Sequence, residues 1–110
     1  MDEKVSNFIN DIKDDSFAVL RGEFVTFVDG LKDQADDFSK LQRVKLEKYL
    51  LQLANREITK QQFDDAMSDL KTVLDMEITL GKVKTKASAQ RMRDGMVRLV
   101  INGLIKAIPG

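Results

Sequence analysis

The best candidates for catalytic acids or bases in this sequence are pairs of neighbouring aspartates, because the sequence contains neither histidine nor cysteine. They form three pairs: Asp14 with Asp15, Asp36 with Asp37, and Asp64 with Asp65. Adjacent residues of a helix point about 100° apart, so the carboxylates of a pair do not converge on one substrate atom. We interpret them as helix caps and solvated faces, and we expect no enzymatic activity.

Metal and cofactor sites also lack their usual residues. Without histidine and cysteine, the common zinc and haem ligands are missing, and no stretch has the order of oxygen ligands of a calcium loop. The six glycines are isolated, so no phosphate-binding loop is formed. We therefore expect no cofactor, no metal and no small-molecule substrate.

Charge is segregated along this neutral chain. Residues 1–39 carry ten acidic and four basic side chains, whereas residues 82–110 carry one acidic and seven basic ones. A possible anion-binding patch consists of Lys82, Lys84, Lys86, Arg91 and Arg93. We favour packing of the acidic and basic ends against each other. Binding of nucleic acid by residues 82–93 is the alternative, although aspartates on the preceding helix would repel phosphates.

The C-terminal segment is apolar around most of a helix. Its polar residues Arg98, Asn102 and Lys106 are spaced by four and form one narrow stripe. The segment is too short to span a bilayer, which takes about 20 residues, and its polar face is too narrow for a membrane-surface helix. We expect its apolar residues in the core or in a homo-oligomeric interface: Met96, Val97, Val100, Ile101, Leu104, Ile105 and Ile108.

Apolar spacing predicts five helices, at approximately residues 3–13, 16–38, 40–54, 60–80 and 87–108. The second carries a seven-residue repeat that consists of Phe17, Phe24, Leu31 and Phe38. Ser39 and Gln42 indicate a capping box before the third helix, but residues 16–54 can also form one continuous helix. Thr59 and Gln62 indicate a capping box for the fourth helix.

Residues 51–70 read LQLANREITKQQFDDAMSDL, a leucine-rich helix, a turn and an I-T-x-x-x-F helix start. This stretch resembles the helical hairpins of the short C-terminal domain class, which implies a hairpin and no activity. That class usually has glycine in the turn, where this chain has Asn55 and Arg56. We expect the turn at residues 54–57, where Asn55 is a residue that tolerates the left-handed conformation.

One domain, residues 1–110, is expected to form an all-α, four- to five-helix bundle with a largely buried, apolar C-terminal helix. The function we favour is a cytoplasmic, non-enzymatic structural or protein-interaction module, a self-associating helical adaptor or assembly factor. Its partners are then other copies of itself or another protein. Alternatives are a nucleic-acid-binding regulator, a peripheral membrane protein, and an inhibitor or immunity-type partner of a larger protein.

Overall fold

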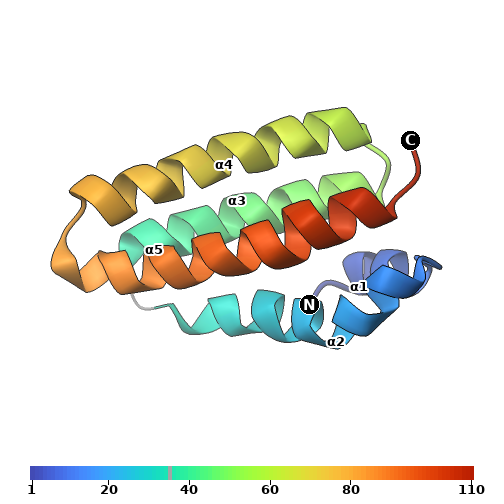
Figure 1. Cartoon of the computed structure of the whole chain (residues 1–110), viewed down its shortest axis with the longest axis horizontal. Coiled ribbons are helices and arrows are strands. Elements are labelled where there is room, and N and C mark those ends of the chain that lie inside the picture. The colour runs from blue at the N-terminus through green and yellow to red at the C-terminus, as the bar shows by residue number, and fades with distance from the viewer. Residues whose placement is uncertain (35) are drawn as a thin grey trace.

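The computed structural model describes residues 1–34 and 36–110, which form a bundle of helices with no strand among them (Figure 1). The expected all-α fold is therefore confirmed. In chain order the elements are α1 (Glu3–Asn10), α2 (Asp15–Gly30), the 3₁₀ turn η1 (Leu31–Asp33), α3 (Asp37–Ala54), α4 (Lys60–Leu80), α5 (Val83–Gly95) and the π-helical stretch η2 (Met96–Ile105).

The first helix is shorter than predicted. It begins after Asp2, whose carboxylate accepts a hydrogen bond from the Lys4 amide, and it ends at Asn10 rather than near residue 13. The carbonyl groups of Ile9 and Ile12 accept hydrogen bonds from the Arg21 guanidinium, at 3.2 and 2.7 Å. Arg21 of α2 therefore supplies partners for carbonyl groups where the chain leaves α1.

The predicted helix 16–38 is wrong at its C-terminal end. Helix α2 stops at Gly30, a 3₁₀ turn follows, and Phe38 belongs to α3. The prediction also included Ala35, which lies outside the described residues. Phe17, Phe24 and Leu31 are all buried, so the seven-residue repeat correctly marks a core stripe. The repeat simply continues across a break between two helices, which removes the possibility of one helix over 16–54.

The predicted capping box of α3 is also wrong. The N-cap is Asp36, whose carboxylate accepts a hydrogen bond from the Ser39 amide at 2.8 Å. Ser39 and Gln42 lie inside the helix and are buried, so α3 begins before residue 40. Asp36 accepts from the amide of Ser39, whereas the predicted serine cap would have accepted from the amide of Gln42, so the observed cap lies about one turn earlier in the chain.

A tight turn joins α3 to α4 and forms the expected hairpin. Arg56, not Asn55, has the left-handed backbone, with φ of 59°. The Glu57 amide then bonds the Gln52 carbonyl at 2.8 Å, and the Arg56 amide bonds that of Leu53 at 3.1 Å, a Schellman motif. Helix α4 begins with the predicted capping box and keeps the predicted bounds.

The last helix begins earlier than predicted, at Val83 rather than near residue 87. Its N-cap is Lys82, which makes no capping hydrogen bond through its side chain. Thr85 and Ser88 lie inside the helix, and the Thr85 hydroxyl donates a hydrogen bond to the Lys82 carbonyl at 3.0 Å. Helix α5 passes directly into η2, and the regular helix ends at residue 107. The Lys60 ammonium group, at the start of α4, donates a 2.8 Å hydrogen bond to the Ile108 carbonyl just beyond this end.

Helices α2, α3, α4 and the joined α5 and η2 run lengthwise through a molecule of 40 × 24 × 22 Å, with α1 at one end (Figure 1). One hydrophobic cluster takes side chains from each of these helices. Its largest fully buried members include Phe17, Phe24, Phe63 and Met96. Burial of such side chains is the main stabilising contribution, at about 1.5–3 kcal/mol each.

Candidate interaction surface

The apolar residues of the C-terminal helix are packed inside this chain. Met96, Val100, Leu104, Ile105 and Ile108 are buried, and Val97 and Ile101 are half-buried. The polar stripe of Arg98, Asn102 and Lys106 is exposed. Helices α2 and α4 contact η2, so neighbouring helices of the same chain surround it. The accessible apolar side chains of the molecule therefore lie elsewhere.

The aspartates serve local structure. Asp14 caps α2 and Asp36 caps α3, while Asp65 accepts a 2.9 Å hydrogen bond from Gln61 in its own helix. The Ser16 hydroxyl and the Phe17 amide lower the pKa of Asp14 through their hydrogen bonds. The capping hydrogen bonds and the lowered pKa indicate that Asp14 stays charged as a cap and is not a carboxylic acid ready to donate a proton.

The pKa of Asp36 is also lowered, although two effects oppose each other. Partial burial acts to raise it, but hydrogen bonds, led by that of the Ser39 amide, outweigh the burial. Among residues 1–34 and 36–110, no group of three or more acidic side chains is placed to hold a metal ion.

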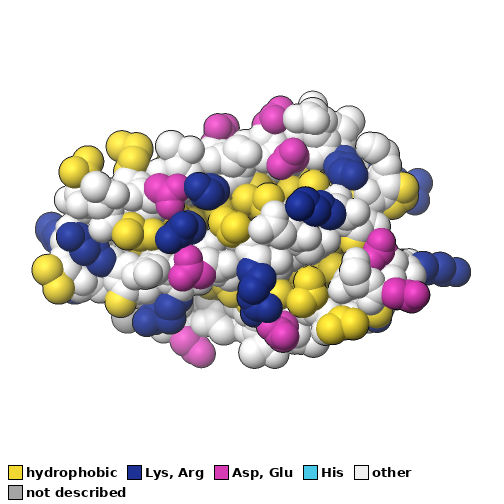
Figure 2. All heavy atoms as spheres, viewed as in Figure 1, with side chains coloured by type: hydrophobic (Ala, Val, Ile, Leu, Met, Phe, Trp, Pro, Cys, Tyr) yellow, Lys and Arg dark blue, Asp and Glu magenta, His cyan; other side chains and the backbone are white. Residues whose placement is uncertain are grey.

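The five residues of the basic patch differ in exposure and in their neighbours. Lys82, Lys84 and Arg91 are exposed, and Lys86 and Arg93 are half-buried. The Arg93 guanidinium lies 3.1 Å from the Asp94 carboxylate and 3.7 Å from that of Asp75. Figure 2 shows basic and acidic side chains interspersed over the face that it draws.

Exposed apolar side chains gather at the end of α4. Met76 is 57% exposed, Leu80 is 79% exposed and Val83, at the start of α5, is 86% exposed. Figure 2 shows hydrophobic side chains protruding at the left end, where Figure 1 places the end of α4 and the start of α5. Apolar groups this accessible in a cluster mark a site of contact more often than single ones do.

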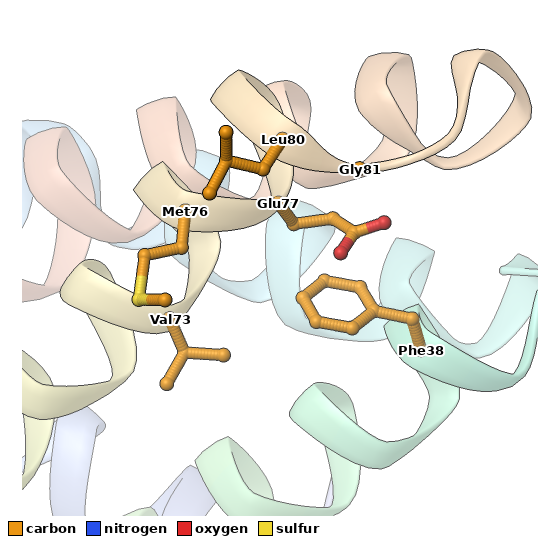
Figure 3. A pocket seen from close by; sticks show the side chains of 6 residues that line it. All are labelled: Phe38, Val73, Met76, Glu77, Leu80 and Gly81. Carbon is orange, nitrogen blue, oxygen red and sulfur yellow. The ribbon is translucent and has the colours of Figure 1, made fainter.

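Together with α3, this end of α4 forms what we call the apolar groove, an open hollow of about 300 Å³. It is lined by Phe38, Val73, Met76, Glu77, Leu80 and Gly81. In Figure 3 the ring of Phe38 from α3 faces the α4 side chains, with the Glu77 carboxylate beside it. The groove therefore offers an apolar floor and one acidic group at its edge.

The groove results from a second apolar stripe on α4. The core stripe runs through Phe63, Met67, Leu70 and Leu74, all buried. Val73, Met76 and Leu80 follow one another at spacings of three and four, so they share a different face. The sequence analysis did not single out Met76 and Leu80, although the spacing of this second stripe was a signal.

Comparisons of the chain with protein-family models, curated proteins and solved structures find no match. The functional assignment therefore depends on the chemistry of the surface alone. Among the described residues, no helix is both long and apolar enough to cross a membrane. The apolar groove, with Val83 next to it, is the feature on which we base a function.

Proposed function

We propose that this protein is a non-enzymatic interaction module that associates with a second copy of itself through the apolar groove. The observation that supports the proposal most directly is the exposure of Met76, Leu80 and Val83. Burial of each large aliphatic side chain contributes about 1.5–3 kcal/mol, so covering this cluster gives a driving force for association.

A second copy fits this surface better than an anionic partner. Glu77 lies in the groove, and Asp36 and Asp37 line the adjoining hollow together with Lys82 and Lys84. Carboxylates next to the lysines weaken the attraction of this region for nucleic acid or an anionic membrane. A second copy brings both signs of charge, so it can match the groove and the charges around it.

Sedimentation of the purified protein tests this proposal. We expect a concentration-dependent shift from monomer to dimer between low and high micromolar protein. The substitutions Met76→Glu and Leu80→Glu should abolish the shift, because each places a charge on the covered surface. A wild-type protein that stays monomeric throughout that range would contradict the proposal.

The matched control is Val19→Glu. Val19 lies on α2, is 80% exposed and is not part of the groove. This variant adds the same charge at a valine about as exposed as Leu80, so it should dimerise as the wild type does. Equal loss of dimer in Val19→Glu and Met76→Glu would show that added negative charge alone, and not the groove, controls association.

A further inference from the structure

Charged residues of opposite sign continue the surface on either side of the apolar groove. Asp69 and Asp65 precede Met76 by seven and eleven residues, which places all three on one face of α4. Beyond the end of α4 come Lys82 and Lys84, and all four charged residues are exposed. From Asp65 to Lys84 the exposed side chains of this stretch are therefore acidic, then apolar, then basic, and Asp36 and Asp37 from the start of α3 line the same hollow as the two lysines.

These charges remain accessible to a partner. Among the described residues, neither the two aspartates nor the two lysines take part in an ion pair. Asp65 bonds only to Gln61 of its own helix, on the same exposed face. Opposite charges at the edge of a contact set orientation and register more than they set affinity.

We infer that two copies pair through α4 in an antiparallel arrangement, about a two-fold axis near Met76. This inference rests on the proposed function and adds the geometry of the contact. Asp69 lies about 10 Å from Met76 along the helix axis, and Leu80, the last residue of α4, lies about 6 Å from Met76 in the other direction, just before Lys82 at the start of α5. A two-fold axis near Met76 therefore brings Asp69 of each copy next to Lys82 and Lys84 of the other.

A parallel pair would have the reverse electrostatics. It would place Asp69 against its own counterpart in the second copy, and the lysines against their counterparts. Like charges at a contact oppose association, so the antiparallel pair is favoured. The antiparallel pair is isologous, as in most homodimers, because the same patch is used on both copies.

Single cysteines test the orientation directly, because residues 1–110 contain none. Disulfides require Cα atoms within about 7 Å, so Met76→Cys should cross-link to itself under mild oxidation. Asp69→Cys should not, because the two copies of residue 69 would be about 20 Å apart. Val19→Cys, on α2 and outside the groove, measures the rate of cross-linking by random collision. Self-cross-linking of Asp69→Cys as fast as Met76→Cys would indicate a parallel pair and overturn the inference.

Charge reversal tests the register. Asp69→Lys alone, and Lys82→Glu with Lys84→Glu, should each weaken dimerisation about tenfold, because like charges then face each other. An equimolar mixture of the two variants should restore it, since both contacts again pair opposite charges. All these residues are exposed, and circular dichroism verifies that each variant folds.

The outcomes separate the inference from the proposed function. If Met76→Glu abolishes dimerisation but mixing the charge variants restores nothing, the groove remains the contact and the antiparallel register is wrong. If the wild type does not dimerise at all, both proposals fail. Dimerisation that survives Met76→Glu but fails with the charge variants would contradict the proposed apolar contact.

Discussion

Gly95 lies directly against the ring of Phe27. A Cβ atom at Gly95 would be 2.3 Å from Cε1 and 2.5 Å from Cδ1 of that ring. The glycine is in α5 and the phenylalanine in α2, so the absence of a side chain lets these two helices approach each other. The close contact explains a glycine inside a long helix, where it would otherwise be unfavourable.

Replacement of this glycine should destabilise the protein. Alanine usually stabilises a helix interior by about 1 kcal/mol relative to glycine, but overpacking costs about 1–3 kcal/mol. We expect Gly95→Ala to lower the free energy of unfolding by about 1 kcal/mol in urea titrations. In a Phe27→Ala background the same change should become neutral or stabilising, because the ring is gone.

Gly22 provides the control. It lies within α2, is exposed, and has no atom within 4 Å of an added Cβ. Gly22→Ala should raise the free energy of unfolding by roughly 0.5–1 kcal/mol. A stabilising Gly95→Ala in the wild-type background would mean that the Phe27 ring moves aside at little cost.

Removal of the Arg21 side chain should release α1 from the bundle. The guanidinium bonds two carbonyl groups at the end of α1 and lies 5.8 Å from the centre of the Phe17 ring. Hydrogen bonds to a charged group contribute about 1.5–3 kcal/mol, so we expect Arg21→Ala to cost about 2 kcal/mol. Hydrogen exchange should be faster over residues 3–12, while the α3–α4 hairpin stays protected.

Arg98 is the matched control for Arg21. It forms an ion pair with Glu23, but both side chains are more than half exposed. Surface pairs of this kind contribute less than about 1 kcal/mol, so Arg98→Ala should leave exchange in α1 unchanged. Equal loss of α1 protection in both variants would show that arginine charge, and not the carbonyl contacts, holds α1.

Glycine at residue 56 should stabilise the α3–α4 turn. Arg56 has φ of 59°, a conformation that costs a non-glycine residue roughly 1–2 kcal/mol. Glycine removes this cost but gives the unfolded chain more freedom, so Arg56→Gly should gain about 0.5–1 kcal/mol. Arg56→Ala should show no gain. Asn55→Gly should be neutral or destabilising, since Asn55 has an ordinary φ of −85°.

The Asp36 cap should make stability depend on pH in the acid range. Its folded-state pKa is below the ordinary 3.8, so the charged cap stabilises the protein above that value. This stabilisation is lost as the pH falls through the folded-state pKa. Asp36→Asn should cost roughly 0.5 kcal/mol at pH 7, and its difference from the wild type should shrink to nothing in strong acid.

Asp37→Asn separates the cap from the general charge effect. Asp37 lies in the first turn of α3, and its replacement leaves the cap in place. Urea titrations of both variants from neutral to acid pH should show the smaller pH-dependent difference for Asp37→Asn. The same pH dependence in both variants would attribute the effect to charge near the helix start and not to the cap.

Local sequence signals were sufficient to predict a helix end where that end is fixed by hydrogen bonds between neighbouring residues. The capping box of Thr59 and Gln62 located the start of α4, because both of its hydrogen bonds join neighbours in the sequence. The apolar C-terminal helix was likewise predicted from its spacing alone. Its narrow polar stripe required surrounding protein but did not distinguish the core of one chain from an interface between chains.

The break after Gly30 was not predictable from the same kind of pattern. Leu31 and Phe38 keep a seven-residue spacing although they belong to different elements, since both face the bundle. The apolar groove was missed for a related reason. The stripe of Met76 and Leu80 resembles a core stripe in the sequence, and it is exposed only because no other helix covers it.

The turn between α3 and α4 has a consequence for the order of folding. Its closing hydrogen bonds join residues three to five apart, whereas the contact between Glu23 and Arg98 spans 75 residues of the chain. Loops that close over few residues lose little chain entropy, so local contacts form sooner. We therefore expect the α3–α4 hairpin to be structured in the folding transition state before α2 docks on η2. Substitutions in that turn should change the folding rate, and those at Gly95 chiefly the unfolding rate.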